Sequence, residues 1–419
     1  MRDVELYRHL LGLQAPWTVG QVTLDIKERR VDVVAQHDKR ASWTCPVCEV
    51  LCPLHDHEPE RQWRHLDSCQ FRTILHARVP RITCEQHGIR QVRVPWAEPL
   101  ARFTMLFERM AIDVLQETSL SAGARLLGLS WDEAQHIMER AVKRGLARRP
   151  KQPPQLMGVD EKSFGAGQSY ATLVYNLETS HVVEMSPGRS RAALLDCLGS
   201  YTPKQMARVE AVALDMCKPY IMCLKEIVPG ALSKLVFDRY HIMTHMTKAV
   251  DQVRRQENQV LRAQGDDSLV GTKYLWLYGE ENLPEKHQVD FEGLRQSNLK
   301  TARAWAIKES LRELWNCGDL EEGQTWWKHW YFWATHSRLE PVKQVAKMVK
   351  RHLGGVMNYF LLPITNAVSE GLNSTIQLLK QRARGYRNLS NFRVAVLFHC
   401  GGLDLYPAGA EDGALSGRL

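Results

Sequence analysis

The sequence predicts a multidomain protein of the α/β class. At 419 residues the chain is too long for one compact core, so roughly two to four domains are expected. Apolar residues make up 44% of the chain and charged residues 24%, which are the proportions of an ordinary globular protein. The hydrophobic pattern changes along the chain between the period of strands and the period of helices, which indicates several kinds of domain.

These changes of pattern divide the chain into six segments. Strand patterns dominate the first segment and helical patterns the second, and the proline-rich "RRPKQPPQ" marks the boundary that follows. Strands and helices then mix, a long helical stretch follows, and one or two helices and a disordered tail complete the chain. The expected segments are 1–97, 98–150, 151–265, 266–358, 359–405 and 406–419.

Charge and targeting signals limit the classes of partner. The net charge of +8 and the isoelectric point near 8.9 favour an acidic partner, and nucleic acid is the commonest large one. The start, "MRDVELYRHLLGL", is too charged for a secretory signal, and no apolar run reaches the ~18 residues of a membrane span. We therefore expect a cytoplasmic protein without a membrane partner, in which structural disulfides are disfavoured.

The first segment predicts a β-hairpin and a zinc site. "QVTLDIKERRVDVVAQH" has two alternating stretches around the charged turn "KERR". Cys45 and Cys48 form one chelating pair, and Cys84 and His87 form a second one behind the strand-like "FRTILHARVPRIT". Four such ligands suit one structural, tetrahedral Zn²⁺ ion, and buried free thiols are the alternative. Further candidates leave the ligand set open: Cys52, His55, His57 and Cys69.

The second segment predicts a helix-turn-helix. "LSAGARLLGLSWDEAQHIMERAVKRGL" has a short helix, the turn "LGLS" and a second helix, which a capping box of Ser130 and Glu133 would begin. Such a second helix enters the major groove of double-stranded DNA, although any helical pair in a bundle shows a similar pattern. The candidate DNA contacts are Trp131, Asp132, Gln135 and His136 near the exposed start, with Arg140, Lys143 and Arg144 at phosphates.

Two apolar strands of the third segment run into acidic residues. "LMGVDEKSF" reaches Asp160 and "VEAVALDM" reaches Asp215, within an expected order of three hairpin-like strands, helix, strand, helix and strand. A carboxylate there is costly unless a cation or hydrogen bonds compensate for it. Two such strands in one sheet bring both acids to one edge, where two Mg²⁺ (or Mn²⁺) ions would support phosphoryl transfer. A solvated strand end is the alternative for each acid.

A third acid, Glu370, is expected on a helix in "NAVSEGLNSTIQLLK". No acid occurs from 371 to 400, whereas several cations do, as in a helix that grips a phosphodiester backbone. Helical spacing puts four residues on the face of Glu370: Asn373, Gln377, Lys380 and Arg384. Arg387 follows them as a further candidate DNA contact.

Asp238 is an alternative to Asp215 as the second metal ligand. In "KLVFDRYHI" it also follows an apolar strand, and His241 lies three residues further on. The two residues otherwise have an auxiliary role, in which they position the substrate or the leaving group. We favour Asp215 as the ligand, because "AVALD" is the more fully apolar strand and hence the more central one.

The fourth segment predicts an all-helical body. "KTARAWAIKESLRELW" places Ala304, Ile307, Leu311 and Leu314 on one helical face. Seven of the twelve tryptophans lie between 276 and 333. We expect them to form a helical core rather than a base-stacking surface.

Together these motifs resemble bacterial insertion-sequence transposases of the ISL-three family, which have a DDE catalytic core. "CPVC" with a second knuckle, "ARLLGLSWD", "GVDE", "ALDM", "VFDRYH" and "SEGLNSTIQLLKQRARGYRN" occur in the order of that family over nearly the whole chain. The resemblance matches Asp160, Asp215 and Glu370 to the catalytic triad. His87 departs from it, because relatives often have cysteine there.

The resemblance also implies a fold and an activity. It implies a zinc-ribbon-like N-terminal module and an RNase H-like core that an all-helical insertion interrupts before the last acid. The implied activity is binding of terminal inverted repeats, hydrolysis at the element ends and joining of the freed 3′-OH to target DNA. The protein would act at the bacterial nucleoid as a homodimer or larger assembly. The alternatives are a DNA-binding regulator with an inactive core and a nuclease without strand joining.

Overall fold

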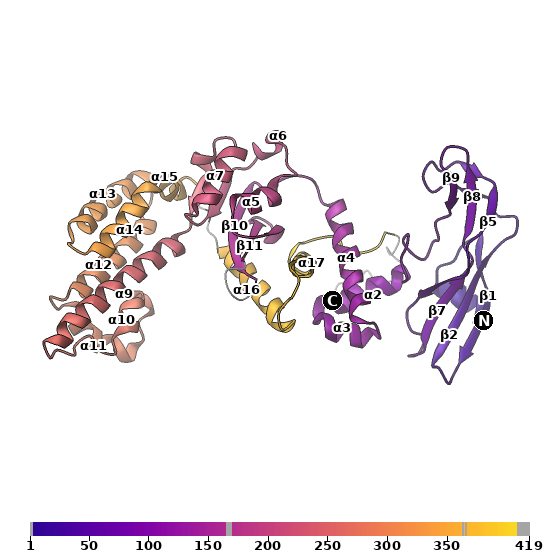
Figure 1. The fold of residues 1–419 in the computed structure, drawn as a ribbon, viewed down its shortest axis with the longest axis horizontal. Coiled ribbons are helices and arrows are strands. Elements are labelled where there is room, and N and C mark those ends of the chain that lie inside the picture. Colours follow the sequence, from indigo (N-terminus) through magenta and orange to yellow (C-terminus); the bar gives the residue numbers. More distant parts are fainter. Residues whose placement is uncertain (1–2, 165–169, 363, 365–366, 409–419) are drawn as a thin grey trace. The chain divides into compact units, whose positions relative to one another are not determined.

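The computed structural model of the chain describes residues 3–164, 170–362, 364 and 367–408 (Figure 1). The chain forms two compact units, one of residues 1–149 and 402–419 and the other of residues 150–401. The first unit is therefore built from both ends of the chain, and the second unit from the residues between them.

A four-stranded sheet of order β1-β2-β7-β6 lies in the first unit, after helix α1 (Asp3–Leu10). Its strands are β1 (Trp17–Asp25), β2 (Arg30–His37), β6 (Arg61–Arg64) and β7 (Arg72–Ala77). β1 and β2 form the predicted hairpin, with a register from Trp17↔His37 to Asp25↔Arg30. Alternation along β2 buries Val31, Val33 and Ala35, so one face of the hairpin contributes to the core.

Two smaller sheets carry the predicted metal ligands. One pairs β3 (Trp43–Thr44) with β4 (Leu51–Cys52), and the other has the order β5-β8-β9 with β5 (Leu54–His57), β8 (Pro80–Cys84) and β9 (Gly88–Gln91). Cys45 directly follows β3, and its carbonyl accepts a 2.9 Å hydrogen bond from the N–H of Glu49. Cys84 pairs with Gly88 across the turn that holds His87. Both chelating pairs therefore lie on tight turns.

The predicted helix-turn-helix is present as α3 (Leu120–Leu127) and α4 (Trp131–Arg148), after α2 (Met105–Glu117). Gly128 ends α3 with a φ of 64°, a conformation that glycine adopts at little cost. Both hydrogen bonds of the predicted capping box form: Ser130 N–H to Glu133 Oε2 at 2.8 Å and Glu133 N–H to Ser130 Oγ at 3.2 Å. The local sequence therefore determines where α4 begins.

The C-terminal segment, residues 402–408, belongs to this helical part of the first unit. Leu405 is 2% exposed, and its carbonyl accepts a hydrogen bond from Arg144 of α4. Tyr406 donates its hydroxyl to a carboxylate of α2 at 2.5 Å. The tail predicted from residue 406 therefore starts too early. Residues 409–419 lie outside the described residues, so the prediction for them stays untested.

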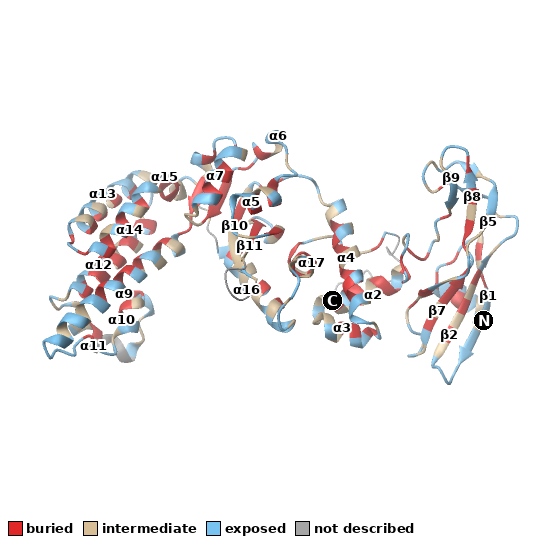
Figure 2. Cartoon of the chain, in the orientation of Figure 1, coloured by how far each residue is buried: buried red, intermediate tan, exposed pale blue. Residues whose placement is uncertain are grey.

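The second unit contains a mixed sheet of order β12-β11-β10-β13-β14. β10 (Leu156–Ser163), β11 (Tyr170–Asn176) and β12 (His181–Pro187) are antiparallel, whereas β13 (Ala211–Leu214) and β14 (Leu235–Phe237) are parallel to β10. The helices between the strands are α5 (Arg191–Leu198), α6 (Pro203–Met206), α7 (Lys218–Ile227) and α8 (Ala231–Lys234). β13 and β14 are buried throughout, and Figure 2 shows buried residues in red in the region of this sheet, around the labels β10 and β11. The predicted order of elements is confirmed.

A body of helices follows the sheet. It comprises α9 (Arg239–Ala263), α10 (Lys273–Leu277), α11 (Glu285–Arg295), α12 (Lys300–Arg312), α13 (Leu320–His336), α14 (Glu340–Arg351) and α15 (Leu353–Met357), with short 3₁₀ turns at Glu280–Asn282, Glu313–Asn316 and Asn358–Phe360. The last helices are α16 (Ala367–Arg382) and α17 (Leu389–Cys400). The apolar core contains the predicted face of Ala304, Ile307, Leu311 and Leu314, and also Trp276, Trp305, Trp315, Trp327 and Trp330. The prediction of a tryptophan-rich helical core is confirmed.

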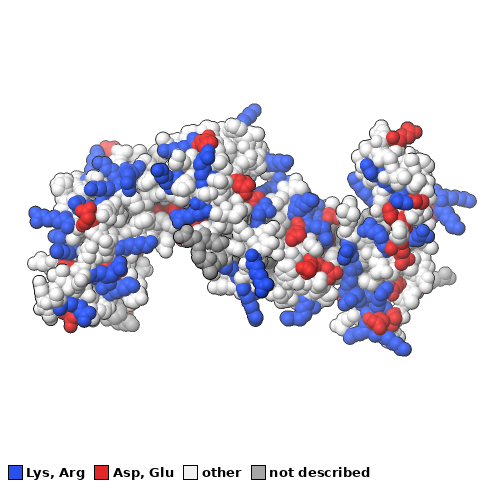
Figure 3. Space-filling model, in the orientation of Figure 1, with Lys and Arg blue, Asp and Glu red and all other residues white. Residues whose placement is uncertain are grey.

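Charge is distributed over the surface. Figure 3 shows lysine and arginine side chains in blue over both units, with acidic side chains among them rather than in a separate region of the visible face. Among the described helices, none is long and apolar enough to cross a membrane.

Candidate active site and metal centres

Three acids lie at one edge of the mixed sheet. The backbone register pairs Val159 with Leu214 and Leu214 with Phe237, and the residues that follow these are Asp160, Asp215 and Asp238. Parallel strands in register reach this edge at the same level, so the three acids neighbour one another. The predicted placement of Asp160 and Asp215 at a common edge is confirmed. Asp238, the predicted alternative, lies at the same edge.

The prediction that a strand ends at Asp160 is wrong. β10 continues to Ser163, because Asp160 pairs with Leu173 on the neighbouring antiparallel strand β11. Only the pairing with β13 stops, after Val159. Asp160 therefore lies at the end of the parallel half of the sheet while its backbone stays fixed by the antiparallel half.

Helix α16 packs directly on β10 beside Asp160. A Cβ atom at Gly158 would lie 2.6 Å from Ser369 Oγ, so only glycine permits this close approach. Asn373 of α16 donates its amide to Asp160 Oδ2 at 2.7 Å and accepts the Tyr175 hydroxyl at 2.9 Å. Burial raises the pKa of Asp160, while hydrogen bonds from the Glu161 N–H and the Asn373 amide favour the charged form. Asn373, predicted as a DNA contact, bonds directly to Asp160 in this structure.

A second group of side chains surrounds Asp215, and sequence reasoning missed it. Glu161, Asp215 and Cys217 place potential ligand atoms within 4.8 Å of one another. Arg189 Nη2 lies 2.8 Å from Glu161 Oε1 and 3.6 Å from Asp215 Oδ2. Burial and the neighbouring charge of Asp215 raise the pKa of Glu161 to about 7. The available signal was the second acid in "GVDE".

Asp238 and Glu370 line one cavity of about 170 Å³, whose wall also includes Tyr240, Trp315 and Tyr359. Asp238 caps α9, since its Oδ1 accepts the N–H of Tyr240 at 2.9 Å. Its buried Oδ2 has no hydrogen-bond partner among the described residues, and His241 Nε2 lies 3.8 Å away. Partial burial and the charge of Asp238 raise the pKa of Glu370. The predicted third acid, Glu370, therefore lies on the same cavity as Asp238.

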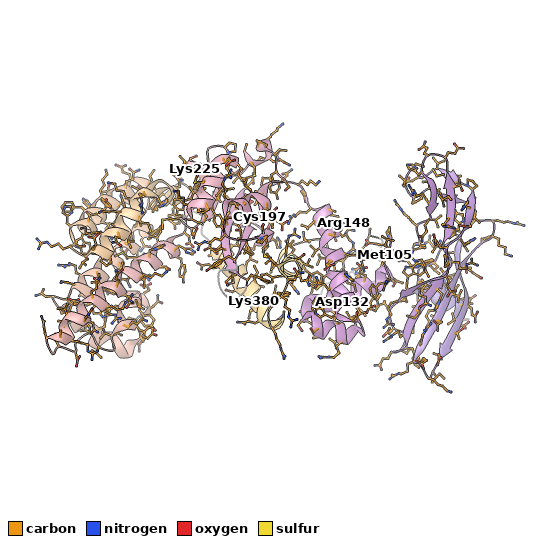
Figure 4. All side chains as sticks on the ribbon, in the orientation of Figure 1. Met105, Asp132, Arg148, Cys197, Lys225 and Lys380 are labelled. Carbon is orange, nitrogen blue, oxygen red and sulfur yellow. The ribbon has the colours of Figure 1, made fainter. Side chains whose placement is uncertain are left out.

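The predicted stripe of cations on α16 is shorter than expected. Lys380, labelled in Figure 4, lies on the helix and donates to the carbonyl of Ser163 at 3.2 Å. The N–H of Gly385 donates to the carbonyl of Lys380, and this hydrogen bond terminates α16. Arg384 therefore lies beyond the helix, with a φ of 55°. Its predicted helical register is therefore wrong. Arg387 is exposed in the loop before α17.

The four predicted zinc ligands form one cluster. Cys48 Sγ lies 3.7 Å from Cys84 Sγ, and His87 Nδ1 lies 3.7 Å from Cys45 Sγ and 3.6 Å from Cys84 Sγ. A tetrahedral Zn²⁺ ion with bonds near 2.3 Å separates sulfur ligands by roughly 3.8 Å, so the cluster fits this ion. Although burial opposes it, the backbone N–H groups of His87 and Gln86 lower the pKa of Cys84 to about 7. This shift favours the thiolate that binds a metal.

The predicted DNA contacts on α4 divide into exposed and internal side chains. Trp131, His136 and Lys143 are exposed, as is Asp132, which Figure 4 labels at the start of the helix. Three of the predicted contacts bond to acidic side chains of the protein. Gln135 is 4% exposed and donates to Glu139 at 3.0 Å.

Arg140 and Arg144 are the other two, with side chains that are 29% and 8% exposed. Arg140 pairs at 2.8 Å with the buried Glu108 of α2, which also binds Arg144 at 2.7 Å. In this arrangement Gln135, Arg140 and Arg144 bond to acidic side chains of the protein, and their roles at bases and phosphates stay predictions. Arg140 and Arg144 hold α4 to α2 through Glu108, which lies too far away in sequence to be inferred from the motif.

Comparison with known proteins identifies the class of protein that carries these sites. Residues 157–396 match a family model described as "Transposase", residues 41–87 match the zinc-finger of transposase IS204/IS1001/IS1096/IS1165, and residues 92–142 match the helix-turn-helix domain of transposase family ISL3. The class is thus an insertion-sequence transposase with two further N-terminal domains. The chain belongs to transposase family ISL3.

Curated relatives carry the same description. The chain is 27% identical over 353 residues to the transposase for insertion sequence element IS1001 of Bordetella parapertussis, covering 83% of this chain and 86% of the relative. It is 26% identical over 421 residues to the transposase for insertion sequence element IS1557 of Mycobacterium tuberculosis, covering 93% of each. The resemblance inferred from the motifs is confirmed.

Proposed function

We propose that this transposase binds the terminal inverted repeats of an insertion sequence, cleaves DNA by metal-dependent hydrolysis and joins the 3′-OH ends to target DNA. The observation that carries the proposal is the common register of Asp160, Asp215 and Asp238, with Glu370 on the cavity that Asp238 lines. Carboxylates gathered at one sheet edge are suited to binding divalent metal ions, which relieve the repulsion between like charges.

Asp160, Asp215 and Glu370 would hold two Mg²⁺ or Mn²⁺ ions. Carboxylate oxygens are the ligands that these hard cations prefer, and Asp238 Oδ2, which accepts no hydrogen bond from the described residues, offers a further oxygen at the same edge. When bound, such ions supply activation of water and stabilisation of the leaving 3′-oxygen.

The protein's own residues orient the acids. Asn373 and Tyr175 fix the carboxylate of Asp160, and the helix start at Asp238 fixes the position of His241. In this proposal Asp238 and His241 are auxiliary residues that position the DNA strand or its leaving group. Lys380, Arg384 and Arg387 would hold the flanking backbone through charge.

We propose that the second unit is an RNase H-like core interrupted by a helical insertion. Support comes from the mixed five-stranded sheet and from α16, which returns to β10 after the helical body. The insertion was expected from residue 266, but the preceding helix α9 packs along α10, α12 and α14 of the helical body. We therefore place the start of the insertion at Arg239.

We propose one structural zinc ion per chain, held by Cys45, Cys48, Cys84 and His87. Four protein ligands leave no open position, so the ion would stabilise the fold of the small sheets rather than catalyse a reaction. Elemental analysis of purified protein should give about one zinc per chain, on the basis of the four-ligand site. Folded, active protein without zinc would contradict this assignment.

We propose that the first unit recognises the element ends and that the chain acts as a dimer or larger assembly. Trp131, His136 and Lys143 remain exposed on α4 and are the revised candidates for DNA contact. Two ends must be cut and joined in one complex, which requires at least two copies of a chain with one active site. Sedimentation with paired-end DNA should show two or more chains per complex.

The catalytic proposal is tested by charge-removing substitutions. Asp160→Asn, Asp215→Asn and Glu370→Gln should each reduce end cleavage by orders of magnitude, because each removes a metal ligand, while binding of end DNA persists. Glu178→Gln, an exposed acid in a turn of the same unit, is the matched control. Asp238→Asn should reduce cleavage less than Asp215→Asn. Normal cleavage by the three ligand variants would overturn the metal-dependent mechanism.

Strand joining is tested with the same protein. Pre-cut ends with free 3′-OH groups should join to target DNA in the presence of Mg²⁺. Cleavage without joining would instead indicate a nuclease.

A further inference from the structure

Arg189 occupies a position between two acids of the candidate site. Its Nη2 atom lies 2.8 Å from Glu161 Oε1 and 3.6 Å from Asp215 Oδ2. Glu161 lies in β10 and Asp215 directly follows β13, and oxygens of the two carboxylates lie within 4.8 Å of each other. Without the guanidinium, two like charges would lie side by side in a largely buried place, which is unfavourable.

The loop that carries Arg189 is fixed by hydrogen bonds on both sides. Before it, Gly188 has a φ of 94°, donates its N–H to Tyr170 at 2.7 Å and accepts the Thr172 hydroxyl at 2.8 Å. After it, Ser190 caps α5 by accepting the N–H of Ala193. The backbone of Arg189 is therefore held in place, while its guanidinium lies 6.0 Å over the Tyr170 ring and contacts both acids.

The two contacts of Arg189 differ in strength. The contact with Glu161 has hydrogen-bond length, whereas that with Asp215 does not. The side chain of Arg189 is 43% exposed, compared with 16% for Glu161 and 15% for Asp215. A cation arriving at Asp215 can therefore displace the weaker contact while Arg189 stays paired with Glu161.

We propose that Arg189 is a displaceable counter-ion that neutralises Asp215 until a divalent metal ion binds, with Glu161 as the anchor that holds the arginine nearby. The proposal rests on the proposed function, since it takes Asp215 as a metal ligand. In its terms Glu161 is a positioning residue and not a metal ligand, and Arg189 lowers the affinity of the site for metal when DNA is absent. Metal binding at Asp215 then requires the contact between Arg189 and Asp215 to break.

The test is the affinity of the full-length, zinc-loaded protein for Mn²⁺, followed by electron paramagnetic resonance without DNA. Arg189→Gln should bind Mn²⁺ roughly fivefold more tightly than the parent, as expected for loss of one competing, partly exposed ion pair. Arg191→Gln is the matched control, because it removes the same charge two residues further along the chain. Arg191 pairs with Glu226 and not with either acid of the site. This variant should leave the Mn²⁺ affinity unchanged.

Further variants separate the possible outcomes. Asp215→Asn should lose the Mn²⁺ signal. If the parent and Asp215→Asn bind Mn²⁺ equally, Asp215 is not a ligand and the proposed function itself is at fault. If Asp215→Asn loses binding but Arg189→Gln matches the parent or binds more weakly, only the role of Arg189 is wrong. Arg189→Lys, which keeps the charge but not the planar fork, should give an intermediate affinity and decides the matter if the glutamine variant does not fold.

Discussion

Asn373 contacts the candidate metal ligand Asp160 with one end of its amide and Tyr175 with the other. Groups that orient a metal ligand without binding the ion often affect activity strongly, because a rotated carboxylate no longer points at the metal. Asn373→Ala should therefore reduce cleavage by about 10- to 100-fold. End-binding measurements and cleavage rates on the same DNA distinguish this effect from lost affinity.

Gln377→Ala is the control for this prediction, since it lies one helical turn further along α16. It should cleave nearly as the parent does. If Asn373→Ala and Gln377→Ala lose activity equally, the effect belongs to helix α16 in general and not to the bond with Asp160.

His65 predicts a pH dependence of stability in the first unit. Burial and the nearby positive charge of Arg64 lower its pKa from 6.5 to about 4, and its Nδ1 lies 2.9 Å from the hydroxyl of Thr104. Between these two pH values the unfolded chain binds more protons than the folded one. The free energy of unfolding should therefore fall as the pH is lowered from 6.5 towards 4, by at most about 1.4 kcal/mol per pH unit.

Melting temperatures of the parent and of His65→Asn between pH 4 and 7 test this prediction. The variant cannot take up the proton, so its stability should fall less steeply with decreasing pH. His9→Asn, which changes an exposed histidine of α1, should follow the parent. Parallel curves for all three proteins would show that His65 does not contribute to the acid sensitivity.

The sequence revealed those site residues whose signal is local. Asp160, Asp215 and Asp238 each follow an apolar run of residues, and the cysteine pairs have their own spacing. The pairing of Arg189 with Glu161 could not be predicted in this way, because the two residues lie in different parts of the chain and no motif contains both. For the same reason the ion pair of Arg140 with Glu108, 32 residues away, could not be predicted.

The start of α4 depends on the capping box of Ser130 and Glu133. Ser130→Ala removes a side-chain acceptor for the first turn and should destabilise the helix by about 1 kcal/mol. Hydrogen exchange of the amides in the first turn of α4 measures this cost. Ser121→Ala on the exposed surface of α3 is the control, and equal exchange in both variants would contradict the role of the cap.

Helices and strands could be predicted well where their ends carry a chemical signal. Gly128 and Ser130 mark the turn of the helix-turn-helix, and both have the expected conformation. The end of α16 could not be predicted from the spacing of cations, because Arg384 continues the helical spacing although the helix ends at Arg382. Gly385 supplies the signal for this end. A regular spacing of charged residues is weaker evidence that a helix continues than a following glycine is that the helix ends.

The first unit as a whole depends on residues from the far end of the chain. Leu405 is buried, Arg144 and Arg148 donate to backbone carbonyls of the C-terminal segment, and Tyr406 bonds to Asp113 of α2. A chain truncated after Gly401 loses all of these contacts. Burial of one leucine alone contributes about 1.5–3 kcal/mol, so α2–α4 should become less stable and the binding of end DNA weaker.

A chain truncated after residue 408 is the matched control, because it keeps the C-terminal segment and lacks only residues 409–419. Limited proteolysis within α4 should be faster in the shorter chain and unchanged in the longer one. Equal protection of α4 in both truncated chains would show that the contacts of Leu405 and Tyr406 add nothing to the unit.

The return of the chain to its first unit also determines when, during translation, that unit can complete its fold. Arg144 and Leu405 are 261 residues apart in sequence, so the helix-turn-helix leaves the ribosome long before its last partner is made. At rates of about 5–20 residues per second, the delay is roughly 13–50 s. During that interval the nascent chain has α2, α3 and α4 without the segment that braces them. The DNA-binding part of this transposase therefore reaches its finished form only after the whole catalytic unit has been translated.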